Sequence, residues 1–447
     1  MNKRGLYIHI PFCVKKCKYC AFLSFKAESE TREEYTKALI REIELRANSA
    51  ANDCPDVRDE NTKTKPIIDT VYIGGGTPSV LEVRQIESIM DAVRNSFRIR
   101  EGAELSIEVN PGTLGNDDSE IADRLRAYKE MGFNRLSMGV QSMDNDRLKF
   151  LGRIHSREDV ERDVRLARKA GFDNINLDLI FSVPKESEED ALSDAERIIA
   201  LGPEHISCYS LQIEEGTPLA EQVEKGVLSE VPDEEDRETY HRICKLLRTA
   251  GYEHYEISNF AKSGDAAGLR SGTYAAGFGS DTAEKSPFRS RHNSLYWDMS
   301  DYIGCGLGAS GFTDGTRYKN TSDIELYIRA MKSISAERAL AAITEEENPN
   351  TSFDNISEAV FTGLRRREGI TYEEACRVYG GSGSAPESSH DEDAPLDAEK
   401  NFWKIFADAK EEAEEFSRGG FLIIDEKGLR LTERGIDISN QIMALFV

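Results

Sequence analysis

Three cysteines near the N-terminus, Cys13, Cys17 and Cys20, are spaced C-x-x-x-C-x-x-C directly after a short strand-like segment. Thiolates this close along a chain are the usual ligands of iron–sulfur clusters. A four-iron cluster needs four ligands, so three thiolates leave one iron open. The pattern therefore predicts a [4Fe–4S] cluster whose open iron binds a small molecule, for which the usual ligand is S-adenosylmethionine (SAM), through its amino and carboxylate groups.

Zinc is the main alternative for this triplet. Structural zinc needs four closed ligands, and the chain offers no matching pair downstream, although His9 is a candidate fourth ligand. The segment from Phe12 to Phe22 is expected to be a loop that leaves a strand, without the helix and two histidines of a zinc knuckle. We therefore favour the cluster.

The remaining cysteines show no disulfide framework. They are Cys54, Cys208, Cys244, Cys305 and Cys376. The N-terminal region has no apolar run long enough for a signal peptide. Because disulfides belong to oxidising compartments, this cysteine usage predicts a protein of the reducing cytoplasm.

Composition and charge narrow the class of protein. A chain of 447 residues with 39% hydrophobic residues is expected to fold into two or three globular domains. The net charge of −24 argues against a nucleic-acid partner or an anionic membrane surface, because both would repel the protein. No stretch approaches the roughly 18 apolar residues that a membrane span requires.

Short apolar runs alternate with amphipathic segments through the first half of the chain. Val160, Val164 and Ala167 share one face of an expected helix, and Gly132, Gly171 and Gly251 are expected to end helices in the left-handed conformation. The expected strands are Leu6–Ile10, Thr70–Ile73, Leu105–Val109, Arg135–Val140, Ile175–Phe181 and Ile206–Ile213. This alternation predicts an α/β fold, a partial (β/α)6 TIM-like barrel, whose ligands gather at the C-terminal ends of the strands.

Three polar breaks interrupt the pattern at Asn48–Lys65, Lys262–Arg289 and Gly380–Ala398, and we interpret them as surface insertions. After the last break, helical segments precede two short strands around Lys427 and Gly428, which predicts a small α+β module resembling a winged helix. We expect a core domain at 1–262, an insertion with a segment that packs on the barrel at 263–318, and a C-terminal domain at 319–447.

Polar residues follow or interrupt several of the expected strands. A glycine run that ends in Thr77 and Pro78 follows the second strand and would let the backbone approach a ligand. Glu108, Gln141, Arg153 and Asp178 lie in or near the other strands. Each would need a partner if buried, so the four together predict a ligand cavity, although single buried polar residues are often only structural.

These motifs resemble those of the oxygen-independent coproporphyrinogen III oxidase-like family of radical SAM proteins. The resemblance runs from Tyr7 to the C-terminus and includes the cysteine loop, Gly-Gly-Gly-Thr-Pro, Gly-Val-Gln-Ser and a His-Asn-x-x-Tyr-Trp segment that starts at His292. It implies that Cys13, Cys17 and Cys20 ligate the cluster. It also implies that SAM contacts Tyr7, Tyr19, Gly75, Gly76, Thr77, Glu108, Gln141, Arg153 and Asp178.

Two features distinguish the family's heme-chaperone branch from its oxidases. The oxidases have a fourth cysteine two residues after the third, where this chain has Phe22, and a long arm before the cluster, where this chain has twelve residues. The His-Asn-x-x-Tyr-Trp segment is typical of the chaperones and has been associated with heme. The resemblance thus implies a chaperone that binds the cluster, SAM and heme, and delivers heme to acceptor proteins.

The alternatives stay open at this point. An oxidase-type enzyme would use a SAM-derived radical to abstract hydrogen from a tetrapyrrole propionate, which leads to decarboxylation. A structural protein would keep the cluster only to hold its fold. His292 is a candidate axial ligand of heme iron or a hydrogen-bonded core residue, and Tyr296 and Trp297 would stack on a porphyrin or fill core. A homodimer is also left open.

Overall fold

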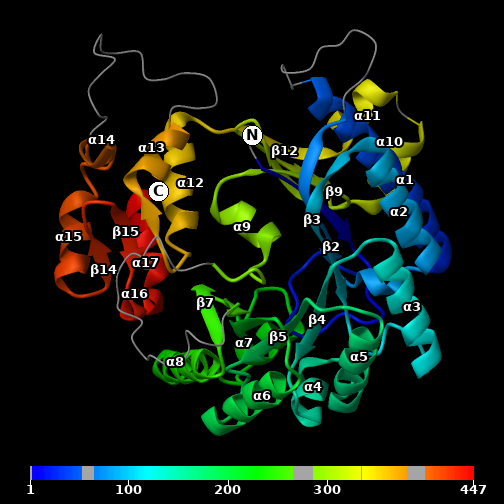
Figure 1. The fold of residues 1–447 in the computed structure, drawn as a ribbon, viewed down its shortest axis with the longest axis horizontal. Helices are drawn as coiled ribbons and strands as arrows, with labels where there is room; N and C mark the ends of the chain where they lie inside the picture. Colours follow the sequence, from blue (N-terminus) through cyan, green and yellow to red (C-terminus); the bar gives the residue numbers. More distant parts are fainter. Residues whose placement is uncertain (1–2, 53–64, 265–284, 334, 380–397) are drawn as a thin grey trace.

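The computed structural model describes residues 3–52, 65–264, 285–333, 335–379 and 398–447 (Figure 1). Within these residues, twelve strands form one continuous sheet. In chain order they are β1 (Arg4–Ile10), β2 (Ile67–Gly75), β3 (Arg98–Val109), β4 (Arg135–Gln141), β5 (Ile175–Phe181), β6 (His205–Ser210), β7 (Tyr252–Glu256), β8 (Asn259–Lys262), β9 (Asp301–Cys305), β10 (Ser310–Thr313), β11 (Thr316–Asn320) and β12 (Thr344–Pro349).

The six expected strands form most of the parallel part of this sheet, in the order β1 to β6. The apolar runs of these strands are buried, as parallel strands covered by helices require. Strand β9 pairs in parallel with β1 on the other side, and antiparallel strands complete both edges. The curved parallel sheet confirms the expected partial TIM-like barrel.

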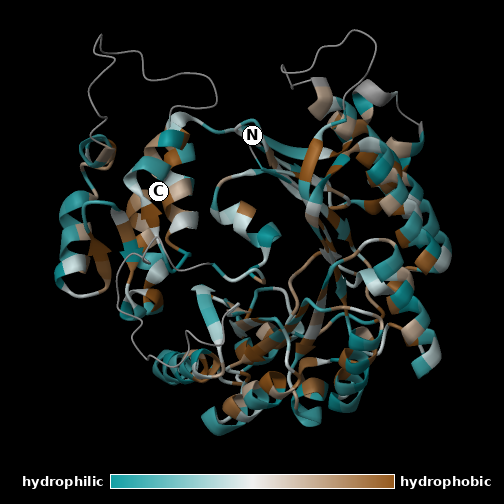
Figure 2. Ribbon diagram, in the orientation of Figure 1, coloured by the Kyte–Doolittle hydropathy of each residue, from teal (hydrophilic) through white to brown (hydrophobic). Residues whose placement is uncertain are grey.

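Helices connect the parallel strands and lie on the outside of the sheet (Figure 1). They are α1 (Ser29–Asn52), α2 (Val83–Ser96), α3 (Asp118–Glu130), α4 (Asn145–Leu151), α5 (Arg157–Lys169), α6 (Glu188–Ala200), α7 (Pro218–Glu224) and α8 (Asp233–Thr249). Helix α5 begins at a capping box made by Ser156 and Asp159, and it buries Val160, Val164 and Ala167 as expected. In Figure 2 the central strands are mostly brown, whereas the surrounding helices carry much teal.

The repeated glycines end their helices as predicted. Gly132, Gly171 and Gly251 have φ angles of 86°, 90° and 99°, and each directly follows the C-cap residue of a helix. Only glycine adopts this left-handed backbone without a steric cost, which lets the chain turn back toward the next strand.

The short helix α9 (Arg291–Trp297) lies at the centre of the view in Figure 1 and packs against β1, β2 and β9. The Glu104 carboxylate in β3 accepts hydrogen bonds from the backbone amides of Arg291 and His292, both at 3.0 Å. These hydrogen bonds hold the first turn of α9 against strand β3. The donors are amides that a helix leaves unpaired, so a buried carboxylate stabilises them.

The C-terminal part has further helices and a small sheet. Helices α10 (Ile324–Ser333) and α11 (Ala336–Ile343) pack on α1, and the sheet has the order β13-β15-β14. The remaining elements are α12 (Ser352–Gly363), β13 (Ile370–Thr371), α13 (Tyr372–Tyr379), α14 (Ala398–Ile405), α15 (Lys410–Arg418), β14 (Leu422–Ile424), β15 (Gly428–Leu431), α16 (Glu433–Asp437) and α17 (Ser439–Met443). Strands β14 and β15 form the expected hairpin.

The expected boundary between residues 318 and 319 falls inside β11, and the sheet continues to β12. The division into three domains stays a prediction. Residues 53–64, 265–284 and 380–397, which make up most of the three expected insertions, lie outside the described residues.

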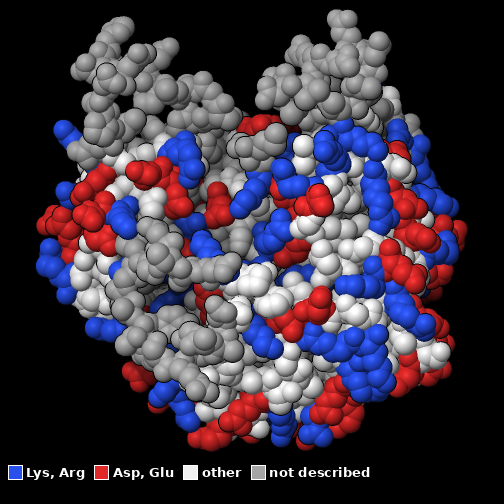
Figure 3. All heavy atoms as spheres, in the orientation of Figure 1, with Lys and Arg blue, Asp and Glu red and all other residues white. Residues whose placement is uncertain are grey.

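The surface carries both signs of charge. Figure 3 shows Lys and Arg interspersed with Asp and Glu over the visible face. In the described part of the chain, no helix is both long and apolar enough to cross a membrane.

Candidate functional site

Backbone hydrogen bonds fix the cysteine loop where its two ends meet and at its middle. The Cys13 amide donates to the Phe25 carbonyl at 3.0 Å, which ties the start of the loop to the chain that leaves it. The Lys18 amide donates to the Leu151 carbonyl, and the Lys18 carbonyl accepts from the Leu219 amide, both at 3.0 Å. The loop therefore sits over the C-terminal end of β1, as the sequence predicts.

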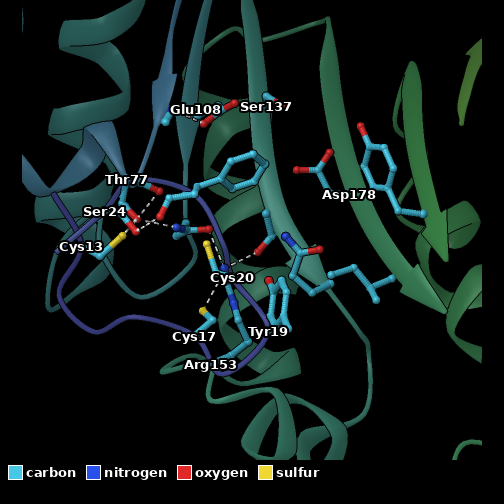
Figure 4. Close-up of a pocket in the computed structure, with 18 of the residues that line it drawn as sticks. Cys13, Cys17, Tyr19, Cys20, Ser24, Thr77, Glu108, Ser137, Arg153 and Asp178 are labelled. Carbon is cyan, nitrogen blue, oxygen red and sulfur yellow. Dashed lines mark hydrogen bonds between the residues drawn. The ribbon is translucent and has the colours of Figure 1, made fainter. Parts of the chain in front are cut away.

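The three thiols face one cavity but have different neighbours (Figure 4). Cys13 Sγ lies 3.5 Å from Thr77 Oγ1, and Cys17 Sγ accepts from Arg153 Nη1 at 3.5 Å. In the described chain, no three His, Cys, Asp or Glu side chains gather closely enough to hold a single metal ion. A cubane does not require such a convergence, because each thiolate binds a different iron.

His9 is not available as a fourth ligand for zinc. Its Nδ1 lies 2.9 Å from the Tyr7 hydroxyl, and its Nε2 lies 3.0 Å from the Leu23 carbonyl oxygen. Its side chain is buried, and burial lowers its pKa. The geometry favours the cluster over zinc.

The glycine run after β2 packs against the root of the cysteine loop. The Gly76 amide donates to the Ile10 carbonyl at 2.8 Å, and a Cβ on Gly76 would come within 2.8 Å of the Phe12 carbonyl oxygen. Gly75 has a φ of +114°, and a Cβ there would meet the His9 ring at 2.6 Å. These glycines are thus required for close contact with β1, a reason that differs from the ligand approach expected from the sequence.

Glu108 projects from β3 into the cavity. Its Oε1 accepts from the Tyr72 hydroxyl at 2.7 Å, and its Oε2 accepts from the Gly75 amide at 3.0 Å. The pKa of Glu108 is raised to about 7, mainly by burial; the nearby Asp178 carboxyl adds to the rise, and the two hydrogen bonds oppose it. The carboxyl group of Glu108 therefore titrates near neutral pH in the protein without ligands.

Asp178, Gln141 and Arg153 line the same cavity from neighbouring elements. Burial raises the pKa of Asp178, whose Oδ1 accepts from Asn176 Nδ2 at 2.7 Å. Gln141 has a φ of 72°, a left-handed backbone that is costly for a residue with a side chain and that is often found at binding sites. Arg153 Nη2 donates to the Gly139 carbonyl at 2.7 Å.

The cavity has a volume of about 500 Å³, within the range of small-molecule sites. All the cluster and SAM residues predicted above line it. They are Tyr7, Cys13, Cys17, Tyr19, Cys20, Gly75, Gly76, Thr77, Glu108, Gln141, Arg153 and Asp178. His292 is 1% exposed and does not line it.

Several lining residues were not identified from the sequence. Tyr72, Asn110, Arg135, Asn176 and Tyr209 also face the cavity. The alternation of side chains along each strand could have identified most of them, because residues two positions apart on a strand face the same side as the site residues already predicted. Ordinary TIM barrels fill this interior with branched apolar side chains, so a polar interior marks a ligand cavity.

The donor set fits the expected cofactors. Three thiols from one loop can ligate three irons, and the buried carboxyl groups of Glu108 and Asp178, which face the same cavity, would suit the cationic sulfonium of SAM. Burial raises the pKa of the Cys20 thiol, and the neighbouring Cys17 and Cys13 raise it further, so iron binding must displace its proton. When bound, the cluster and SAM together supply one-electron chemistry.

Comparison with known proteins identifies the family of this chain. Residues 7–198 match the family model of the Radical SAM superfamily. The heme chaperone HemW of Bacillus subtilis is 32% identical over 85% of this chain and 88% of its own length. HemW of Escherichia coli is 35% identical over 71% of this chain and 73% of its own length.

The fold is also that of a solved structure. Coproporphyrinogen III oxidase (HemN) from Escherichia coli, described as a radical SAM enzyme, aligns with a TM-score of 0.74, 22% identity, and coverage of 100% of this chain and 90% of its own. This likeness concerns the fold. The Radical SAM domain supports the predicted cluster and SAM, and the sequence relatives decide the family. The chain belongs to the HemW family, within the oxygen-independent coproporphyrinogen III oxidase-like group of radical SAM proteins.

Proposed function

We propose that this protein is a heme chaperone that binds a [4Fe–4S] cluster, SAM and heme and delivers heme to acceptor proteins. The names of its relatives support heme handling. The observation that carries the proposal is the apolar rim of the cavity, formed by Val14, Phe22, Ile154 and Tyr209. These large side chains are exposed at the cavity mouth, and the Phe22 side chain is 71% exposed. A flat apolar macrocycle would cover them.

The apolar rim also favours the chaperone function over the oxidase function. Phe22 stands where the oxidases of this family have a fourth cysteine, so the substrate-facing side of the loop differs in chemistry from theirs. An exposed aromatic ring favours stacking on a porphyrin face.

In this proposal, Cys13, Cys17 and Cys20 ligate the cluster, and nine further lining residues contact SAM. Those SAM contacts are Tyr7, Tyr19, Gly75, Gly76, Thr77, Glu108, Gln141, Arg153 and Asp178. The proposal includes a cytoplasmic location and no nucleic-acid partner. The net charge of −24 supports the latter.

Heme ligation by His292 stays a prediction that the proposal does not need. Both ring nitrogens of His292 already have hydrogen-bond partners, so iron ligation would require one of these bonds to break. The experiment in the next subsection tests this role directly.

The test is anaerobic reconstitution with iron and sulfide, followed by parallel assays of heme binding and coproporphyrinogen III decarboxylation. We expect a heme Soret band that saturates with added heme, and no decarboxylated product. Replacing Phe22 with Ser should weaken heme binding without affecting the cluster absorption. Product that accumulates in proportion to the enzyme would instead support the oxidase-type function, and a reconstituted protein that binds no heme would refute the chaperone.

A further inference from the structure

His292 is buried where helix α9 packs against the sheet. It is 1% exposed, its Nδ1 lies 2.7 Å from the Thr70 hydroxyl, and its Nε2 lies 2.8 Å from the Tyr296 hydroxyl. Helix α9 is itself held by Glu104 through its first-turn amides. The orientation of the His292 ring is therefore fixed by two hydroxyl partners, from Thr70 and Tyr296, and by the anchored backbone of α9.

The face of this ring lies against Tyr72. The two ring centroids are 5.1 Å apart with an angle of 25° between the planes, which is a stacked arrangement. The hydroxyl of Tyr72 donates to Glu108 Oε1 at 2.7 Å. A continuous set of contacts thus connects His292 in α9 with the carboxyl group in the cavity.

Close packing leaves this set little freedom to rearrange. A Cβ on Gly5 would come within 3.3 Å of His292 Cε1, and a Cβ on Gly74 would come within 2.7 Å of Tyr72 Cε1. The same Cβ on Gly74 would come within 2.9 Å of the Glu108 carboxyl carbon. Glycine at both positions makes room for the stacked rings and the carboxyl group.

We propose that His292 is a positioning residue for SAM binding, which acts by holding Tyr72 so that its hydroxyl orients the Glu108 carboxyl. The inference rests on the proposed function, because it takes Glu108 as a SAM contact. It assigns the His-Asn-x-x-Tyr-Trp histidine to the SAM site and leaves the heme iron to another ligand.

The ionisation of His292 agrees with this role. The pKa of His292 is lowered to about 3, mainly by burial and in part by the nearby Arg135 guanidinium. The ring is therefore neutral at physiological pH and presents one donor and one acceptor nitrogen, which suits two fixed hydroxyl partners.

A double-mutant cycle tests the coupling. The variants are Tyr72→Phe, His292→Ala and the double variant, each reconstituted with iron and sulfide, and the readout is the dissociation constant for SAM. Tyr72→Phe removes the hydrogen bond to Glu108 and should weaken SAM binding about tenfold. His292→Ala should weaken it about fivefold, and the double variant should be no weaker than Tyr72→Phe alone.

Further variants separate positioning from general damage. His292→Gln retains a donor and an acceptor and should lose less SAM affinity than His292→Ala. His241→Ala is the histidine control, because His241 pairs with Asp437 and does not line the cavity, and it should leave SAM binding unchanged. The cluster absorption and thermal unfolding identify any variant that fails to fold, and Tyr72→Phe then still tests the contact with Glu108.

Heme binding to the same variants completes the test. We expect the Soret spectrum of His292→Ala to match that of the unaltered protein. The inference is overturned if His292→Ala binds SAM normally, if the two single effects add, or if its Soret spectrum shifts while SAM binding is unchanged. If the unaltered protein binds SAM but not heme, the proposed chaperone function is refuted and the role of His292 in SAM binding still holds. If the unaltered protein binds no SAM, the proposed SAM site is refuted.

Discussion

The two ends of the barrel use similar polar residues to opposite effect. At the α9 end, hydrogen bonds connect the helix to the sheet: Glu104 in β3 accepts from two amides of α9, and Thr70 in β2 pairs with His292 in α9. At the cluster end, Gln141 has a left-handed backbone, and Arg153 Nε has no hydrogen-bond partner in the part of the chain that the structure describes. The satisfied groups at the α9 end fix a helix against the sheet, whereas the strained and unpaired groups at the cluster end lie in the cavity where we propose that a ligand binds.

The largest effect should come from the cluster end. Replacing Cys13, Cys17 or Cys20 with Ala should abolish the visible charge-transfer absorption of the reconstituted protein, because each thiolate ligates a separate iron. Cys376→Ala is the control within the described residues, since Cys376 lies outside the cavity. Cys54→Ala should also leave the absorption intact, although Cys54 lies outside the described residues. Loss of the cluster in either control would contradict the assignment.

A change at the α9 end should affect stability first. Glu104→Ala leaves two buried amides of α9 without their acceptor and should reduce the free energy of unfolding by about 3 kcal/mol. Chemical denaturation of the apo-protein measures this loss. Glu101→Ala, at an exposed position on the same strand, should change it little. Equal effects of the two substitutions would mean that Glu104 does not anchor the helix.

Glu108 should make SAM binding depend on pH. Because its pKa is about 7 in the free protein, the carboxyl group is mostly protonated at pH 6 and ionised at pH 8. SAM carries a positive sulfonium, so its affinity should rise up to about tenfold over this range. In Glu108→Gln the affinity should be low at both pH values. A wild-type affinity that falls as the pH rises would contradict this role.

The same shift makes a prediction for the apo-protein. The folded pKa is raised above the ordinary value of 4.5, so the folded state retains a proton that the unfolded chain releases. The contribution of Glu108 to stability is therefore present below pH 4.5 and is lost as the pH rises toward 7. Glu108→Gln should remove this part of the pH dependence, measured by denaturation at several pH values.

The smallest effect should come from Tyr296→Phe. This change removes one hydrogen bond to His292 but keeps the ring, so the free energy of unfolding should fall by about 1 kcal/mol. SAM affinity should change less than twofold, because Tyr72 keeps its stacked partner. A loss of SAM affinity as large as that of Tyr72→Phe would place Tyr296 in the site itself.

Much of the fold could be predicted from periodicity. The apolar runs located six of the seven parallel strands, all but β9, and the predicted bounds of Ile175–Phe181 match β5. The edge strands were missed because they are short or polar; β12 has the sequence Thr-Glu-Glu-Glu-Asn-Pro, in which nothing alternates. Such strands form because a neighbouring strand pairs with their backbone, a contact that local sequence does not reveal.

The sequence by itself determined the cysteine loop, six of the seven parallel strands and part of the set of residues around the cavity, because short spacing and strand ends decide these locally. Only the tertiary structure decided that β9 joins β1, that the glycines pack on the root of the loop, and that both nitrogens of His292 are already bonded. Contacts between residues more than two hundred positions apart, such as Thr70 and His292, depend on chain packing and leave no local pattern.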